Sequence, residues 1–278
     1  MKLTKAQFKA LENKRITLLG MSGVGKTHLA KLIGQDGGWF HFSGDFHIGA
    51  THLKDEIVDN IALKMKKDPW LKTLLNNNSI GVNSQVTFDN LEPISAFLGK
   101  VGNPEEGGLP IDEFARRQAL FMAAETKAMY DVPLFIERAL NQGQEHFIND
   151  AGGSLCELAD SRVYEILAEN TLILYIKTSN ANEKMLIDRA QKRPKPLYYQ
   201  TEFLQWALSD YLEENKFSYV AQINPDDFVR WVFPKLVVNR LPKYQSIADQ
   251  FGYTISSDSL YQCKTTNDVF NLIDEALD

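Results

Sequence analysis

Residues 20–27, which read GMSGVGKT, constrain this chain more than any other stretch. They fit the pattern G-x-x-x-x-G-K-[ST], whose glycines let a loop turn so that its backbone N–H groups converge on phosphate oxygens. Lys26 would reach the β- and γ-phosphates of a nucleoside triphosphate, and Thr27 would offer its hydroxyl to Mg²⁺. The positive end of the following helix would face the same anion. The residues expected to bind ATP here are Gly20, Met21, Ser22, Gly23, Val24, Gly25, Lys26 and Thr27.

The flanking residues supply the context that this loop needs. Residues 15–19 form an apolar run typical of a buried strand, and residues 28–33 begin a helix that ends at Gly34. Strand, loop and helix therefore follow in the required order. A plain glycine-rich turn is the alternative, but such a turn would require neither the Lys26–Thr27 pair nor an apolar strand before it.

Composition and charge limit the classes of binding partner and the cellular compartment that we expect for this chain. The chain has 278 residues and a net charge of −6, without a long basic run, which argues against nucleic acid as the main partner. Its two cysteines, Cys156 and Cys263, are too few for a disulfide framework and favour a reducing cytoplasm. Residues 1–14 are polar, and no apolar window is long enough for a membrane helix, so we expect no membrane association.

The alternation of strands and helices predicts a parallel, doubly wound sheet, and hence a three-layer α/β/α P-loop kinase fold with five parallel strands. The expected strands are 15–19, 39–43, 145–149, 171–176 and 253–255. The expected helices include 52–67, 111–129, 159–169, 201–214 and 267–277, the last capped by Thr265 with Asp268. We expect residues 1–45 and 131–278 to form the core, and residues 46–130 an inserted, mainly helical, acceptor-binding subdomain.

Two aspartates follow predicted strands, at the edge where open α/β sheets bind ligands. Asp45 could accept a proton from an acceptor hydroxyl or hold it in line for attack, or it could simply cap a turn. Asp150 fits a Walker-B-type carboxylate that holds Mg²⁺ through its water shell, or again a turn aspartate. Gly152 and Gly153 would let a ligand approach the backbone closely, or would form a tight turn.

Two groups of arginines are candidates for binding anions. Arg189 and Arg193 lie in a basic segment after the fourth strand and could contact ATP and offset charge on the transferring phosphoryl group. A solvated charge run is the alternative. Arg116 and Arg117 lie on the amphipathic helix over 111–129, where surface solvation is the alternative to binding an acceptor.

Taken in chain order, these residues resemble the shikimate kinase family of P-loop small-molecule kinases. After the P-loop, Asp45 matches the substrate-facing aspartate of that family, and Arg116 or Arg117 matches its helix arginine. Gly152 and Gly153 match two glycines of a glycine triplet.

The later part of the chain extends the resemblance. Arg193 and Pro194 match the family's lid, and Arg240, in the run RLPKY, matches a closing motif that contacts a substrate carboxylate. The resemblance implies ATP and Mg²⁺ as cofactors. It also implies that Lys26, Asp45 and Arg193 are catalytic, and that Arg117 and Arg240 hold an acceptor anion.

The chain also departs from the family's pattern. Ser43 stands where the family has the first aspartate of an Asp-x-Asp pair, and Asp150 could substitute for it. Ala151 replaces the first glycine of the triplet, and Lys195 with Pro196 alters the lid. Residues 46–110 and 217–239 read as insertions, so the acceptor pocket is expected to be reshaped.

These observations favour an ATP-dependent kinase that phosphorylates a hydroxyl of a small anionic metabolite, with shikimate among the candidates. One alternative is a P-loop ATPase or nucleotide sensor whose insertions bind a protein partner. Another is a nucleoside or nucleotide kinase, because paired arginines suit a nucleotide phosphate as well as a carboxylate.

Overall fold

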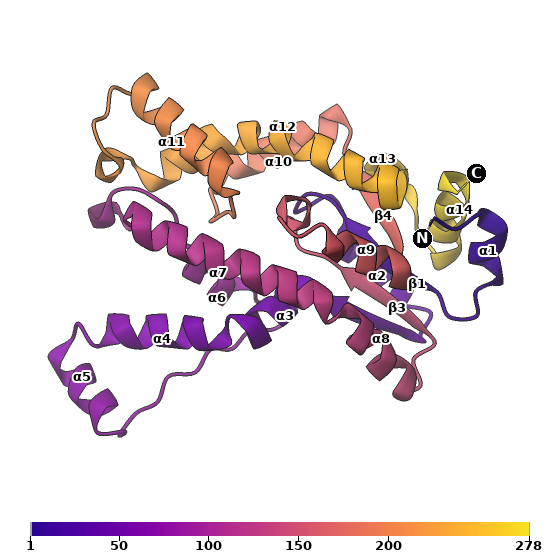
Figure 1. The fold of residues 1–278 in the computed structure, drawn as a ribbon, viewed down its shortest axis with the longest axis horizontal. Coiled ribbons are helices and arrows are strands. Elements are labelled where there is room, and N and C mark those ends of the chain that lie inside the picture. The colour runs from indigo at the N-terminus through magenta and orange to yellow at the C-terminus, as the bar shows by residue number, and fades with distance from the viewer. Residues whose placement is uncertain (1, 278) are drawn as a thin grey trace.

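The computed structural model describes residues 2–277 and contains a five-stranded sheet in the order β2-β3-β1-β4-β5, with every pairing parallel (Figure 1). The strands are β1 (Arg15–Leu19), β2 (Trp39–Ser43), β3 (His146–Asp150), β4 (Leu172–Lys177) and β5 (Gly252–Ser256). All five predicted strands are therefore confirmed, with bounds shifted by at most a residue or two. The three central strands are almost entirely buried, as their apolar sequences require.

Helices make up most of the remaining chain. The structure has α1 (Lys5–Ala10), α2 (Lys26–Gly34), α3 (Gly44–His47), η1 (Ile48–His52, a π-turn), α4 (Lys54–Met65), α5 (Pro69–Asn76), α6 (Glu92–Leu98), η2 (Pro104–Glu106), α7 (Ile111–Tyr130), α8 (Val132–Asn141), η3 (Leu155–Glu157), α9 (Arg162–Asn170), α10 (Asn180–Lys192), α11 (Thr201–Glu214), η4 (Val220–Gln222), α12 (Pro225–Phe251), α13 (Ser257–Gln262) and α14 (Thr266–Ala276). The predicted bounds of α11 are matched at both ends, and Thr265 caps α14 in a capping box with Asp268.

Helices cover both faces of the sheet. Helices α2 and α14 contact each other and pack on one face, whereas α8, α9 and α12 pack on the other. This three-layer arrangement, with the P-loop between β1 and α2, confirms the predicted α/β P-loop kinase fold. No helix within residues 2–277 is both long enough and apolar enough to cross a membrane.

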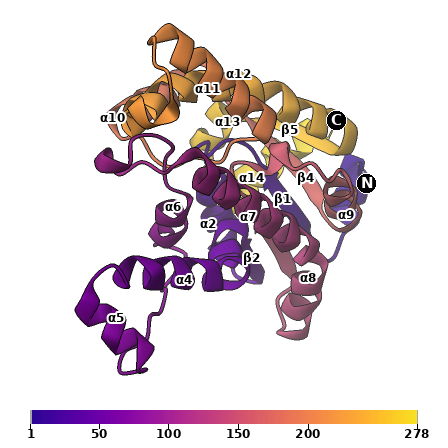
Figure 2. The same cartoon turned by 60° about the vertical axis from the view of Figure 1, so that its left-hand side comes forward.

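The predicted insertion 46–130 divides into a packed part and a projecting part. Helices α4 and α5 extend away from the body in both views, whereas α7 lies along it (Figures 1 and 2). Buried residues of this region, among them Ile48, Phe97 and Phe121, belong to the same hydrophobic cluster as the sheet. The division into a core and an acceptor-binding subdomain stays a prediction.

Residues 217–239, expected to be a second insertion, mostly enter the long helix α12. Its N-terminal half joins α11 in a second hydrophobic cluster that also contains Phe114 of α7. Helix α12 therefore bridges the sheet and the far end of α7, and it carries Arg240 between these two contacts.

Candidate active site

The P-loop leaves the end of β1 and leads directly into α2. Gly25 caps α2 with φ of 107°, a left-handed conformation that favours glycine. The Lys26 ammonium is buried and donates to the carbonyl oxygens of Gly20 at 2.7 Å and Met21 at 3.0 Å. Burial lowers the pKa of Lys26, and the nearby carboxylates of Asp150 and Asp45 oppose that shift.

Thr27 and Asp150 meet at the carboxyl ends of β1 and β3. The Thr27 hydroxyl donates to Asp150 Oδ2 at 2.6 Å. Burial alone would raise the pKa of Asp150, but the nearby His41 imidazole, the charge of Lys26 and the hydrogen bond from the Thr27 hydroxyl lower it on balance, so the carboxylate stays ionised. A hydroxyl and a carboxylate are hard oxygen ligands that suit Mg²⁺ with retained waters. The two residues therefore fit the predicted metal site.

Asp45 lies in the first turn of α3, which Ser43 begins by accepting a hydrogen bond from the Phe46 N–H at 3.3 Å. Ser43 thus serves as a helix cap at the position where the family has a carboxylate. Burial raises the pKa of Asp45 to about 6; Lys26 works against this shift and Asp150 adds to it.

One polar cavity of about 240 Å³ joins the P-loop to these carboxylates. Its lining residues are Ser22, Gly23, Gly25, Lys26, Thr27, His28, His41, Ser43, Asp45, Phe88, Leu91, Asp150, Ala151, Gly153 and Tyr261. The cavity therefore brings together five P-loop residues, both predicted metal residues and, of the predicted acceptor residues, Asp45 and Gly153. His41 also borders this cavity, with its Nε2 3.7 Å from Asp150 Oδ2, although no motif in the sequence singles it out.

The glycines after Asp150 permit close packing around this cavity. A Cβ at Gly153 would lie 2.9 Å from the Ser22 backbone nitrogen, so a side chain there would push the loop away from the P-loop. A Cβ at Gly152 would lie 2.4 Å from Glu125 Oε1 and 3.0 Å from Asp45 Oδ1. Both positions therefore require glycine for steric reasons, whichever ligand binds.

Arg189 and Arg193 lie on the other side of the P-loop, on and just after α10. A Cβ at Gly23 would lie 2.9 Å from Arg189 Nη1, which places this guanidinium against the loop. Both arginines, with Lys195 and Ser22, line a second cavity of about 260 Å³. None of these three basic side chains has an ion-pair partner among residues 2–277. Their charges therefore remain available to an anion at the P-loop.

The structure does not bring Arg116 and Arg117 to either cavity. Arg116 is on the surface and pairs with Glu113 and Glu56. Arg117 is buried, donates to Glu113 Oε1 and to the Phe97 carbonyl, both at 2.6 Å, and lies over the Phe97 ring. These contacts fix α7 to α6 and leave neither arginine facing an acceptor.

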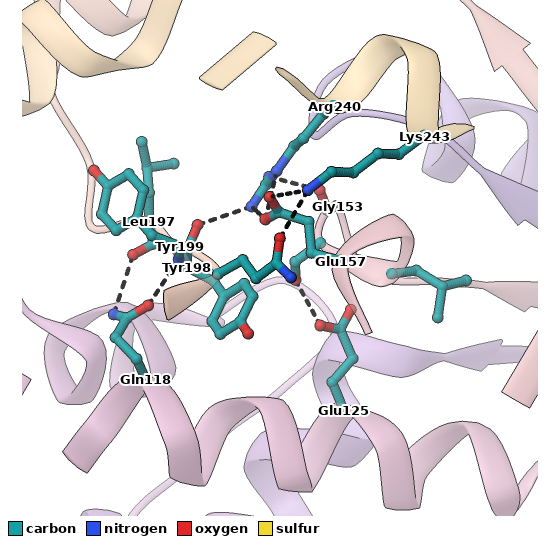
Figure 3. Close-up of polar contacts among 12 residues, drawn as sticks. Gln118, Glu125, Gly153, Glu157, Leu197, Tyr198, Tyr199, Arg240 and Lys243 are labelled. Atoms are coloured by element: carbon teal, nitrogen blue, oxygen red, sulfur yellow. Dashed lines mark hydrogen bonds and ion pairs between the residues drawn. The ribbon is translucent and has the colours of Figure 1, made fainter. Parts of the chain in front are cut away.

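Arg240 is also held in internal contacts, although it lies next to the glycine loop (Figure 3). Its Nε and Nη2 donate to Glu157 Oε2 at 2.9 and 2.5 Å, and its remaining bonds reach the carbonyl oxygens of Gly153 and Tyr198, both at 2.8 Å. Four of the five guanidinium N–H groups are thereby used. Arg240 therefore supports the loop around Gly153, and its charge is balanced by a buried carboxylate.

The family that the motifs resemble also appears among solved structures. No family model matches the sequence, and no curated protein matches it. The chain is similar to shikimate kinases. The Bacteroides thetaiotaomicron enzyme is 14% identical with a TM-score of 0.44, over 95% of this chain and 98% of that chain. The Acinetobacter baumannii enzyme, solved in complex with shikimate, is 15% identical with a TM-score of 0.33, over 84% and 98%. The Aquifex aeolicus enzyme is 14% identical with a TM-score of 0.27, over 82% and 98%.

Glu125 of α7 is a candidate site residue that the sequence reasoning missed. Its side chain is fully buried and lies beside Asp45 and Gly152. It shares the buried face of α7 with Phe121 and Ala128, at spacings of four and three residues. The sequence could have indicated Glu125, because it is an acidic residue on the apolar face of a predicted helix.

A separate polar cluster is formed by His47, the last residue of α3, together with His52 and Asp131. The π-turn η1 aligns His47 with His52, and their Nε2 atoms lie 2.7 and 2.8 Å from Asp131 Oδ2. The three ligand atoms lie within 4.8 Å of one another, a set that a divalent transition metal would accept. Hydrogen bonds within the cluster already satisfy these groups, so we assign it the structural role of fastening α3 to the junction of α7 and α8.

Proposed function

We propose that this protein is an ATP- and Mg²⁺-dependent phosphotransferase that phosphorylates a hydroxyl group of a small molecule. The observation that carries the proposal is the single cavity that Lys26, Thr27, Asp150 and Asp45 share. Phosphate-binding, metal-binding and acceptor-orienting groups thus face one another at the carboxyl edge of the sheet, where an acceptor hydroxyl can approach a γ-phosphate.

The P-loop side would bind and polarise the nucleotide. The Lys26 ammonium would exchange its two carbonyl partners for phosphate oxygens. Thr27 and Asp150 would hold Mg²⁺, whose charge offsets that of the phosphates. Arg189 and Arg193 would add hydrogen bonds to the phosphate chain from the opposite side, and Arg193 would stabilise charge on the transferring group.

Asp45 would act on the acceptor. With a pKa of about 6, its carboxyl group is mostly ionised at neutral pH and can accept a hydrogen bond from a hydroxyl. It would orient that hydroxyl for attack and receive its proton as the new phosphate ester forms. The geometry does not support an acceptor anion held by Arg117 and Arg240, because internal partners occupy both guanidinium groups.

ADP release from Mg-ATP in the presence of a compound panel tests the proposal. Release that requires one compound and falls at least about tenfold in Asp45→Asn supports it. Asp59→Asn, which changes an exposed aspartate on α4, is the matched control and should behave like the wild type. ATP turnover that no compound stimulates, or that Asp45→Asn leaves unchanged, would overturn it.

A further inference from the structure

Phe88 forms part of the wall of the cavity that holds the P-loop and Asp45, yet 50% of it is exposed. Leu91, from the same segment of the chain, also lines this cavity. Apolar surface that is left open at a concave site favours a ligand with apolar surface of its own, because binding removes both surfaces from water. This wall therefore carries information about the acceptor that the charged residues of the site do not.

Local contacts hold the Phe88 ring in place. The residue lies in a turn in which Thr87 and Asn90 each donate a backbone N–H to the carbonyl oxygen of the other, both at 3.1 Å. The ring stacks on Phe46, with centroids 4.7 Å apart and planes 23° apart. It also makes a T-shaped contact with His41, with centroids 5.4 Å apart. The ring is thus oriented in the protein alone, which lowers the entropic cost of packing a ligand against it.

The Phe88 ring lies on the acceptor side of the cavity. Its stacking partner Phe46 directly follows Asp45 in α3. Tyr261, another aromatic residue of the lining, belongs to the nucleotide side, because its hydroxyl donates to the Gly23 carbonyl at 3.3 Å. In a cavity of about 240 Å³, a ligand whose hydroxyl reaches Asp45 would also meet the ring of Phe88.

The charges on this side suit an uncharged acceptor. Among the described residues, Lys26 is the only lysine or arginine that lines the cavity, and it faces the phosphates in the proposed function. Arg117 and Arg240 are held by internal partners. A carboxylate beside Asp45 and Asp150 would therefore meet two acidic side chains and no further lysine or arginine.

We propose that the acceptor contains a planar aromatic ring, which packs against the open surface of Phe88 while a hydroxyl group of the same molecule reaches Asp45. This inference rests on the proposed function and narrows its substrate class to uncharged alcohols that carry such a ring, with nucleosides as the type that joins a base to several hydroxyl groups. In the transfer, the acceptor oxygen bonds to the γ-phosphorus, the bond from that phosphorus to ADP breaks, and the hydroxyl proton passes to Asp45.

Compounds that differ in the ring test this inference on the wild-type protein. ADP release from Mg-ATP is measured with adenosine, uridine and methyl β-D-ribofuranoside, which share a ribose, then with benzyl alcohol and cyclohexylmethanol, and with shikimate. The expected result is stimulation by an aromatic compound, with a kcat/KM at least about tenfold above that of its counterpart without the aromatic ring.

Substitutions of Phe88 test the residue itself. Phe88→Ala removes the ring, so the KM for the aromatic acceptor should rise at least about tenfold while the KM for ATP is unchanged. Phe88→Tyr keeps the ring and should keep the KM of the wild type. Trp70→Ala, which removes an exposed aromatic side chain of α5 that does not line the cavity, is the matched control. Calorimetric titration of the acceptor in the presence of Mg-ADP gives the same comparison without turnover.

The outcomes separate the two proposals. Turnover that requires shikimate or a compound without an aromatic ring, or an aromatic preference that Phe88→Ala leaves unchanged, overturns the inference but retains the phosphotransferase. A rise in the KM for ATP in place of that for the acceptor would assign Phe88 to the nucleotide and also overturns the inference. The absence of stimulation by every compound overturns the phosphotransferase and the inference with it.

Discussion

The contact between Thr27 and Asp150 joins the first turn of α2 to the end of β3. Thr27 lies in the first turn of α2, which follows β1, and Asp150 ends β3; their side chains lie 2.6 Å apart. Their separation depends on the parallel register of β1 and β3, in which Leu18 pairs with Asp150. The proposed metal site therefore lies between the start of α2 and the end of β3.

Asp150→Asn should impair turnover more than nucleotide binding. The amide keeps the shape of the side chain but removes the charge that holds Mg²⁺, so we expect kcat to fall about 100-fold or more and the Mg²⁺ requirement to rise. A Mg²⁺ titration of ADP release, with nucleotide affinity measured in parallel, checks this. An unchanged Mg²⁺ dependence would remove Asp150 from the metal site.

Glu125 should make stability depend on pH. Burial raises its pKa from 4.5 to about 8 in the folded protein, so the folded state binds this proton more tightly than the unfolded chain does. The resulting stabilisation is complete below pH 4.5 and is lost as the pH rises toward 8. Denaturant unfolding of Glu125→Gln and of the wild type, measured from pH 5 to pH 9, should show a steeper decline in the wild type, because the raised pKa of Asp45 contributes equally to both proteins. If the free energy of unfolding changed with pH in the same way in both proteins, the raised pKa of Glu125 would be wrong.

Among the elements, α12 carries the buried polar side chain that connects three other segments of the chain. Arg240 of this helix binds η3 through Glu157, the glycine loop through Gly153 and the extended segment after α10 through Tyr198. Lys243, one turn later, lies 3.5 Å from Glu157 Oε1. Three chain segments that border the candidate site are thus fastened to one helix (Figure 3).

Arg240→Ala should destabilise the fold by about 3–5 kcal/mol, because it leaves Glu157 buried without its main counter-charge. Denaturant unfolding measures the loss. The double variant Arg240→Met with Glu157→Met removes both charges and should lose less than the single variant. Equal losses in the two would mean that packing, and not the ion pair, is what Arg240 contributes.

Sequence patterns predicted the elements whose signals are local. The apolar run over 171–176 and the glycine-containing P-loop each require nothing beyond their own residues. The role of Arg240 was beyond such reasoning, because its partner Glu157 is 83 residues away and only the folded chain shows that the pair is buried. Glu125 was within reach, since its helical spacing from Phe121 places it on the buried face of α7.

At the scale of the whole molecule, one hydrophobic cluster runs from the sheet into the region 46–130, while α4 and α5 project from it (Figure 2). The exposed apolar side chains of this arm include Leu63 at 64% and Trp70 at 69% exposure. Composition could not distinguish a packed insertion from a projecting one, because both are helical and mixed in charge. The prediction of one inserted subdomain therefore covers two parts that differ in packing.

Limited proteolysis should separate these parts. The stretch 77–90 has little regular structure and is mostly exposed, so we expect proteinase K to cut there first. The sheet and α7 should stay resistant, because their buried residues belong to the common cluster. Fragment masses from a time course check this, and early cleavage within α7 would contradict the continuity of the core.

Acceptor-dependent ADP release from Mg-ATP, compared between the wild type and Asp45→Asn, is the decisive measurement for the proposed phosphotransfer. The wild type should release ADP only when a hydroxyl-bearing small molecule is present, and Asp45→Asn should lose at least about nine-tenths of this activity while it still binds ATP. ADP release that needs no acceptor, at the same rate in both proteins, would mean that the protein is not a phosphotransferase of this kind.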